Sequence, residues 1–492
     1  MRFNPDALDY EGVFPGRAGR GRENDASSEA WSNSPPRQET STNTFVVPET
    51  ERWLRRPGHT ISFALLFLFS VILYLRPYEM IPALSSFMQM AFYTGIVTLA
   101  VYVVTQLSIE GNLTARPREI NLVLLLALAA LLSMPLAVSI GDAWEKFSGI
   151  LLKTVLIFIV LVNVVRTELR LRMLLLLVLA VSIYLSVNAI NDYRMGVFKT
   201  GEMETARIAG SIKGLFENSN DLALHMVTMI PIAVALGLGS RNVLKKLAYL
   251  GATGLMAGAV VVTFSRGGFI GLVASSLLLV RRLGKKNRVA TAGAMVFAVI
   301  MFLALAPGAF SSRLSTIFNS SADLTGSSSQ RTEVLKRSIW VALRYPVTGV
   351  GIGNFKHKAP RNLETHNAYT QVAAEMGLGA LVVYILLLVH PLKRLRLIEN
   401  ESYSKQEQTR FYYLAIGLQA SLVGFMVSSF FGAVAYHWYV YYLVGYAVCL
   451  HRLYIMKFQP EHPFPATFWE QPFAKKTEKL MSSQPASQLG HV

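Results

Sequence analysis

Apolar residues in this chain gather into long runs that are separated by short polar and charged segments. Most runs are about 17 to 25 residues long, the length that an α-helix needs to cross a hydrocarbon core about 30 Å thick. Lipid offers the backbone no hydrogen-bond partner, so such runs must be helical. The pattern therefore predicts an all-α polytopic membrane protein.

The sequence predicts about twelve transmembrane helices. Their approximate bounds are 61–75, 84–104, 120–138, 150–165, 173–190, 222–238, 247–264, 269–280, 290–306, 368–389, 411–430 and 438–453. The eighth run is short for a full crossing. We therefore expect it to form a tight or broken hairpin with the seventh, around residues 265–268.

These spans predict five parts in the chain. Residues 1–57 form a cytoplasmic tail, 58–306 hold helices one to nine, 307–366 form a long extracytoplasmic loop with short helices, 367–454 hold helices ten to twelve, and 455–492 form a second cytoplasmic tail. The first tail is rich in Gly, Pro, Ser and Arg and has no apolar segment typical of a signal peptide. We expect it to be disordered and not to be a cleavable signal.

Composition supports the membrane assignment, because hydrophobic residues make up 52% of the 492 positions and charged residues only 16%. The net charge of +17 raises the question of nucleic-acid binding. The two tails together are neutral, however, so all of the excess lies in the membrane part. That distribution favours loops that set the topology, and we expect no nucleic-acid partner.

Basic residues occur in every second loop between the predicted spans. They are Arg116 and Arg118; Arg166, Arg170 and Arg172; Arg241, Lys245 and Lys246; Arg281, Arg282, Lys285, Lys286 and Arg288; and Lys393, Arg394 and Arg396. The positive-inside rule assigns these loops and both termini to the cytoplasm. The long loops 191–221 and 307–365 are then extracytoplasmic.

Few residues suit metal or nucleotide chemistry. The single cysteine, Cys449, lies inside the last apolar run and excludes an intrachain disulfide or a multi-cysteine metal site. No cluster has metal-ligand spacing, and no Gly-x-x-x-x-Gly-Lys loop is present. We therefore expect neither a cofactor nor ATP hydrolysis, and charge compensation falls to arginine.

Two arginines lie where the predicted topology reaches the extracytoplasmic side. Arg207 precedes Asn218 and Asn220, which stand at the start of the next helix. It is either a solvated loop residue or part of a site. Arg266 lies at the turn between two apolar helices, followed by two glycines. It is either a snorkelling interfacial residue or a ligand-binding one, and the glycines favour the site because they permit close approach.

The long loop and the helix after it carry two further features. Arg331 precedes a glycine-rich run, 346–355, which is either a plain turn or a flexible element that positions a ligand. His366 and Asn367 precede the tenth span. His366 is either a capping residue or a general base, and nearby arginines would lower its pKa and keep it in the neutral form that a base requires.

In these elements the sequence resembles the O-antigen ligase and polymerase family of bacterial envelope glycosyltransferases, over about residues 207–380. The residues that carry the resemblance are Arg207, Gly210, Asn218 and Asn220; Ser265, Arg266 and Gly267; Arg331, Trp340, Pro346, Gly351, Asn354 and Phe355; and His366, Asn367, Glu375 and Gly377. The chain has Gly268 where family members commonly have alanine.

The resemblance implies transfer of a glycan from undecaprenyl diphosphate to a hydroxyl of a glycan, lipid or protein acceptor, without metal or nucleotide, in the bacterial inner membrane. It assigns Arg207 and Arg266 to the leaving diphosphate and His366 to activation of the acceptor hydroxyl. A guanidinium suits a diphosphate because its planar fork binds phosphate oxygens bidentately. The remaining assignments, to substrate binding, are Arg331, Asn218, Asn220 and Asn367.

Three functions stay open at this point. A ligase joins a finished glycan to an acceptor, whereas an O-antigen or exopolysaccharide polymerase joins carrier-linked repeats, and we favour the ligase. The third alternative is a multi-pass lipid or glycan transporter. Transporters place ionisable groups near the bilayer midplane. Here the predicted spans hold few charges, and the suggestive residues collect at one face.

Overall fold

The computed structural model describes residues 58–200, 206–208, 210–212, 216, 218–284, 327–403, 405 and 408–458. The predicted ninth span, at 290–306, and the predicted first tail lie outside these residues. Each of the other eleven predicted spans overlaps a helix, although the bounds differ by several residues in places. These helices are α2 (Thr60–Leu75), α4 (Met90–Glu110), α5 (Arg118–Ser133), α7 (Leu152–Val164), α8 (Glu168–Arg194), α9 (Ser219–Leu238), α10 (Val243–Val262), α11 (Arg266–Leu283), α15 (Ala368–Ser402), α16 (Thr409–Ser428) and α17 (Trp438–Phe458).

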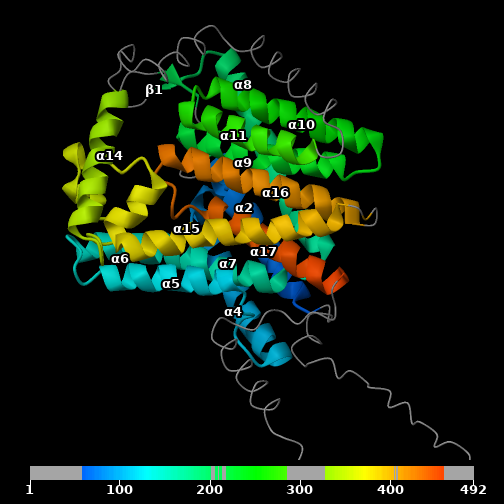
Figure 1. Ribbon diagram of the computed structural model, residues 1–492, viewed down its shortest axis with the longest axis horizontal. Helices are drawn as coiled ribbons and strands as arrows, with labels where there is room; N and C mark the ends of the chain where they lie inside the picture. Colours follow the sequence, from blue (N-terminus) through cyan, green and yellow to red (C-terminus); the bar gives the residue numbers. More distant parts are fainter. Residues whose placement is uncertain are drawn as a thin grey trace, which may run out of the picture. The chain divides into compact units, whose positions relative to one another are not determined.

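Shorter elements connect these helices. They are α3 (Pro77–Met80), the 3-10 turns η2 (Pro82–Phe87), η5 (Phe355–Lys358), η6 (Pro360–Asn362) and η8 (Ser429–Phe431), the helix α6 (Ile140–Lys146), the π-helical turn η3 (Phe147–Leu151), the strands β1 (Lys199–Thr200) and β2 (Ala206–Arg207), and the helix α14 (Ser327–Arg344). Most of the long helices run side by side, and α14 lies across one end of them (Figure 1).

Eight helical segments among the described residues are long and apolar enough to cross a membrane. The predicted count of twelve is therefore not confirmed. Of the remaining helices, α5 is short, with 16 residues, whereas α11, with 18 residues, carries three arginines, Arg266, Arg281 and Arg282. The fourth predicted span begins earlier than expected, because α6, η3 and α7 form one continuous segment, Ile140–Val164.

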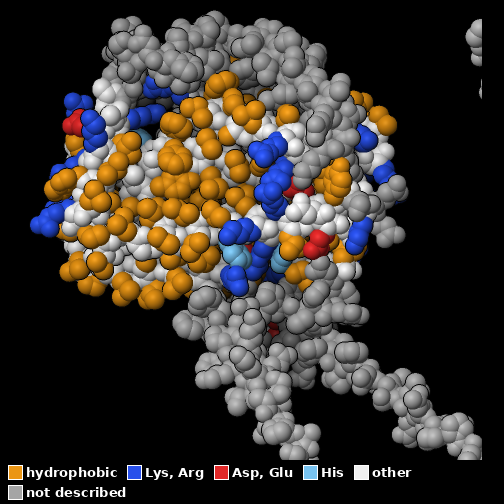
Figure 2. Space-filling view, in the orientation of Figure 1, with side chains coloured by type: hydrophobic (Ala, Val, Ile, Leu, Met, Phe, Trp, Pro, Cys, Tyr) orange, Lys and Arg blue, Asp and Glu red, His pale blue; other side chains and the backbone are white. Residues whose placement is uncertain are grey.

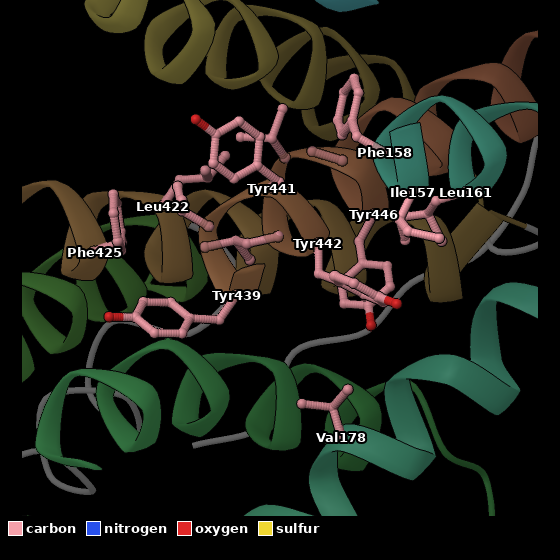
Figure 3. Packing of buried hydrophobic residues seen from close by; sticks show 14 of the residues in the cluster. Ile157, Phe158, Leu161, Val178, Leu422, Phe425, Tyr439, Tyr441, Tyr442 and Tyr446 are labelled. Carbon is pink, nitrogen blue, oxygen red and sulfur yellow. The ribbon is translucent and has the colours of Figure 1, made fainter. Parts of the chain in front are cut away.

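The helix α17 lies in the middle of the bundle and contacts α7, α8, α15 and α16. Nearly all of its side chains are buried, among them several tyrosines that pack against Phe158 and Leu161 of α7 (Figure 3). A buried phenol usually has a hydrogen-bond partner for its hydroxyl. Tyr442 has one, because its hydroxyl lies 2.9 Å from the Ser70 hydroxyl in α2.

The outward faces of several helices are apolar. Large side chains of α4, α5 and α10 are more than half exposed, including Val104, Leu132 and Leu250. Figure 2 shows a broad field of apolar side chains, with lysine and arginine gathered beside it. An apolar surface of this kind is stable only against lipid or another apolar surface, which agrees with a membrane protein.

Basic residues of the alternate loops meet at one end of the bundle. Arg166 pairs with Glu110, Arg394 with Glu119 at 3.0 Å, and the Arg170 guanidinium donates to the Gly58 carbonyl at 2.9 Å. The loops at 58–59, 111–117, 165–167 and the region around 390 thus lie together. Their assignment to the cytoplasm stays a prediction.

Small residues allow the helices to approach closely, as is common in membranes. A Cβ atom on Gly417 of α16 would lie 2.5 Å from the Ala235 Cβ atom and 2.8 Å from the Pro231 carbonyl oxygen, both in α9. Neither neighbour is the end of a flexible side chain. The contact between α9 and α16 therefore depends on glycine at position 417.

Gly417→Ala should destabilise the protein, because the added methyl group overpacks this contact at a cost of about 1–3 kcal/mol. Gly254→Ala in α10 is the matched control, since its Cβ atom would have no atom within 4 Å and alanine favours the helix by about 0.5–1 kcal/mol. Thermal unfolding of purified protein in detergent measures both. Equal melting temperatures for the two variants would contradict the packing argument.

Candidate active site

At the end opposite to the basic loops, several helices begin close together. The Ser265 hydroxyl before α11 donates to the Asn220 side-chain oxygen in α9 at 2.8 Å. The Val350 amide of the glycine-rich run donates to the Ala374 carbonyl of α15 at 2.9 Å. These contacts join elements that the sequence singled out separately.

Ser265 fixes the turn that leads into α11. Its hydroxyl also accepts the Gly268 amide at 3.2 Å and so caps the helix. Phe264 before it has left-handed backbone, with φ 52°. The chain therefore reverses sharply and places Arg266, which is half-buried, in the first turn of α11. The partial positive charge of the helix start adds to that of the guanidinium, and both favour an anion.

The two glycines after Arg266 have a different role from the one expected. A Cβ atom on Gly267 would lie 2.6 Å from the Phe431 Cβ atom, and one on Gly268 would lie 2.5 Å from the Ala223 Cβ atom. Both positions face protein. The interpretation that they admit a ligand is therefore corrected, because they let α11 pack against α9 and the end of α16.

The glycine-rich run forms a tightly packed turn between α14 and α15. Phe355 is buried with Val334 and Val341 of α14 and Ala374 of α15. Gly351 has φ 96°, and a Cβ atom there would lie 2.4 Å from that of Ala137. Of the two interpretations of this run, the plain turn agrees with the structure.

Asn354 in the same run is wholly buried, and its side chain holds the start of α6 in place. Its side-chain oxygen accepts the Ser139 amide at 2.7 Å, and its side-chain nitrogen donates to the Ser139 carbonyl at 3.1 Å. This pair of bonds fixes the start of α6 against the loop, although 215 positions separate the two residues. Asn354 is thus a positioning residue.

His366 stands just before α15 with left-handed backbone, φ 50°, and is half-buried. Burial, and then the positive charge of Arg331, lower the pKa of His366 below its ordinary value, while the Glu364 carboxylate acts in the opposite direction. The influence of Arg331 agrees in direction with the effect expected from nearby arginines. It also shows that α14 and the start of α15 lie close together.

The three asparagines assigned to substrate binding all lie at helix starts. Asn218 caps α9 by accepting the Asn220 amide at 2.9 Å. Asn367 is buried and caps α15, because its side-chain oxygen accepts the Tyr369 and Thr370 amides at 2.9 and 3.1 Å. The oxygen of each asparagine, including that of Asn220, is bonded within the protein. Their role toward a substrate stays a prediction.

Arg207 lies in β2, opposite Lys199 of β1 in the antiparallel pair. Its side chain lies outside what the structure describes. The backbone after it is closely folded, since the Gly210 amide donates to the Phe216 carbonyl at 2.7 Å. The Arg207 backbone therefore belongs to the segment that joins α8 to α9, before Asn218 in the sequence.

Sequence reasoning missed Lys146 and Tyr436. Lys146 of α6 forms an ion pair with Glu364 at 3.8 Å, and Glu364 also interacts electrostatically with Asp221 of α9. Tyr436, before α17, donates to Glu375 of α15 at 2.8 Å. Lys146 lies just ahead of an apolar run and could have been noticed, but nothing in the sequence pairs Tyr436 with Glu375.

Glu364, in the segment that also holds His366, thus pairs with α6 and lies near the start of α9. Among the described residues, no group of three or more His, Cys, Asp or Glu side chains lies together in a way that could hold a metal ion. The charges at this end are therefore chiefly the guanidinium groups, Lys146 and single carboxylates. An arrangement of this kind can bind an anionic group beside a neutral imidazole.

The fold and this end of the helices together define a multi-helix membrane protein. The family model described as O-antigen ligase matches residues 251–385, which include Arg266, Arg331 and His366. This match confirms the predicted resemblance to the O-antigen ligase and polymerase family over that segment, and together with the apolar helices it indicates a bacterial membrane protein. No curated protein matches the chain.

Asn367→Ala should lower the stability of the protein by about 1 kcal/mol, because α15 loses its capping oxygen. Asn367→Asp should retain most of the stability, since a carboxylate accepts the same two amides and suits a helix start. Thermal unfolding in detergent compares the two variants. If aspartate destabilises as strongly as alanine, the side-chain oxygen of residue 367 is not the group that stabilises the start of α15.

Proposed function

We propose that this protein transfers a glycan from undecaprenyl diphosphate to an acceptor hydroxyl on the extracytoplasmic face of the bacterial inner membrane. The reaction requires neither metal nor nucleotide, because the donor already carries a good leaving group. The observation that carries the proposal is that the half-buried His366, just before α15, lies near α14, which carries Arg331; burial and then the charge of Arg331 lower the pKa of the imidazole. The O-antigen ligase match over the same segment supports it.

His366 is the proposed general base. As the acceptor oxygen attacks the anomeric carbon, its proton passes to the neutral imidazole. The bond between that carbon and the diphosphate oxygen breaks, and undecaprenyl diphosphate leaves with the electron pair. A half-buried imidazole whose pKa is lowered stays neutral at physiological pH, and it can therefore accept the proton.

Arg266, Arg207 and Arg331 are the proposed partners of the diphosphate. Negative charge develops on its oxygen atoms as the glycosidic bond breaks, and fixed cations in a partly dry site stabilise that charge most effectively. Arg266 has the further support of the α11 helix start. The Asn220–Ser265 hydrogen bond supports the grouping of Arg266 with the start of α9, where Asn218 lies.

A ligase remains our preferred assignment, and a polymerase is the alternative. Purified protein that is given carrier-linked glycan together with lipid A-core separates the two. A ligase forms the glycan linked to lipid A-core, whereas a polymerase forms longer carrier-linked chains. A transporter would instead move carrier-linked glycan across vesicles without forming a new glycosidic bond.

Arg266→Ala or His366→Ala should lower glycan transfer by about 100- to 1,000-fold while leaving the amount of protein in the membrane unchanged. Arg266→Lys should rescue poorly, because an ammonium group lacks the planar fork of guanidinium. His366→Asn tests the base separately, since asparagine tolerates left-handed backbone. Product formation from carrier-linked glycan is the measurement.

The matched control for Arg266 is Arg281→Ala, which removes an exposed arginine at the other end of α11. Near wild-type transfer in either alanine variant would refute the assigned roles. Cysteines introduced at 266 and 366 provide a second test, because Cys449 is buried and gives little background labelling. Labelling of the two positions from opposite sides of the membrane would exclude a common site.

Arg331→Gln should move the acidic limb of the pH–activity profile to higher pH. The positive charge of Arg331 lowers the pKa of His366, so its removal raises that pKa, and the base becomes protonated at a higher pH. Lys336→Gln, an exposed cation on the same helix, is the control. The limb is read from initial rates between pH 5 and 8, where an unperturbed histidine titrates; an unmoved limb would show that His366 is not the titrating base.

A further inference from the structure

A cavity of about 380 Å³ lies at the end of the bundle opposite to the candidate active site. It forms where the ends of α9 and α17 meet the starts of α8, α10 and α16. Its volume is within the range of small-molecule pockets in proteins. Nothing in the proposed glycosyl transfer uses this cavity.

The walls of the cavity combine leucine side chains with four cations. The apolar wall includes Leu175, Leu414 and Leu450, and the cations are Arg172, Arg241, Lys245 and Arg410. Among the described residues, Glu168 is the only acidic one in the lining, and it already forms an ion pair with Lys457 at 2.6 Å.

Within the described part of the chain, none of these four cations has a carboxylate within ion-pair distance. Other arginines at the same end do have one, since Arg166 pairs with Glu110 and Arg394 with Glu119. Four like charges around one opening repel each other unless an anion lies between them. The cavity is therefore electrostatically suited to an anionic ligand.

The apolar wall indicates which class of anionic ligand suits the cavity. A soluble anion would leave the leucines without a partner, whereas an acyl chain would contact them. Leu169, which lines the cavity, is 67% exposed, and Leu244, in the first turn of α10, is 75% exposed. Such exposure is stable where lipid covers the surface. The opening thus lies beside apolar surface that lipid would cover.

We propose that this cavity binds the phosphate headgroup of an anionic phospholipid, with the first part of an acyl chain against the leucines. Arg172, Arg241, Lys245 and Arg410 contact the phosphate, and guanidinium groups suit it because they donate two parallel hydrogen bonds. The start of α10 adds its partial positive charge, because Asn242 and Lys245 of its first turn line the cavity. The site is independent of the active site.

The test uses the full-length protein in nanodiscs that contain phosphatidylglycerol and phosphatidylcholine in equal amounts. Native mass spectrometry counts the phosphatidylglycerol molecules retained after release from the nanodisc. The pocket variant combines Arg241→Gln, Lys245→Gln and Arg410→Gln. The control variant combines Arg116→Gln, Arg281→Gln and Arg396→Gln, which removes the same charge from exposed positions of other basic loops.

We expect the wild-type protein and the control variant to retain phosphatidylglycerol. The pocket variant should retain at least tenfold less phosphatidylglycerol than the wild-type protein. Equal retention in the two variants would overturn the proposal.

A further experiment adds inorganic phosphate at millimolar concentration to the wild-type protein. Complete displacement of the lipid would show that the cavity recognises free phosphate and would overturn the lipid assignment, whereas persistence of the lipid supports it. Thermal unfolding identifies a pocket variant that fails to fold, and single substitutions at Arg241 and Arg410 then replace it.

Discussion

Polar groups at the ends of these helices must find partners inside the protein, and the candidate active site is built on that constraint. A helix start leaves amide groups without intrahelical partners, and lipid supplies none. Asn218, Ser265 and Asn367 meet this requirement for α9, α11 and α15. Because three capped starts lie at one end, the amide dipoles of three helices bring partial positive charge to the same region.

The side chains of arginine and histidine act together with the partial positive charge of these helix starts. Arg266 lies in the first turn of α11, and the charge of Arg331 reaches His366 from α14. Glu364 moderates the field, since it pairs with Lys146 and raises the pKa of His366. The result is a region in which an anion is favoured while the imidazole stays neutral. That combination is what transfer from a diphosphate to a hydroxyl requires.

The sequence predicted the long helices well, because a run of apolar residues is a local signal. The elements that the sequence singled out for the site also lie near one another, since Asn220 contacts Ser265 and Arg331 influences His366, but their roles stay predictions. The sequence could not predict the early start of the fourth span at Ile140 or the bond between Asn354 and Ser139. These features depend on contacts between distant segments, which no local pattern records.

The glycines after Arg266 show the same limit in another form. A glycine that permits a sharp turn, one that admits a ligand and one that admits a neighbouring helix look alike in a sequence. Only the contacts of Gly267 with Phe431 and of Gly268 with Ala223 decide for the third case. The family match includes these residues, but it does not explain why glycine is needed there.

The central position of α17 has a consequence for biosynthesis. This helix follows every other described helix in the chain, yet it contacts α7, α8, α15 and α16 and buries nearly all of its side chains. During translation the earlier helices enter the bilayer before the element that fills the space between them exists. The contacts of α7, α8, α15 and α16 with α17 can therefore form only after all of these helices have been synthesised.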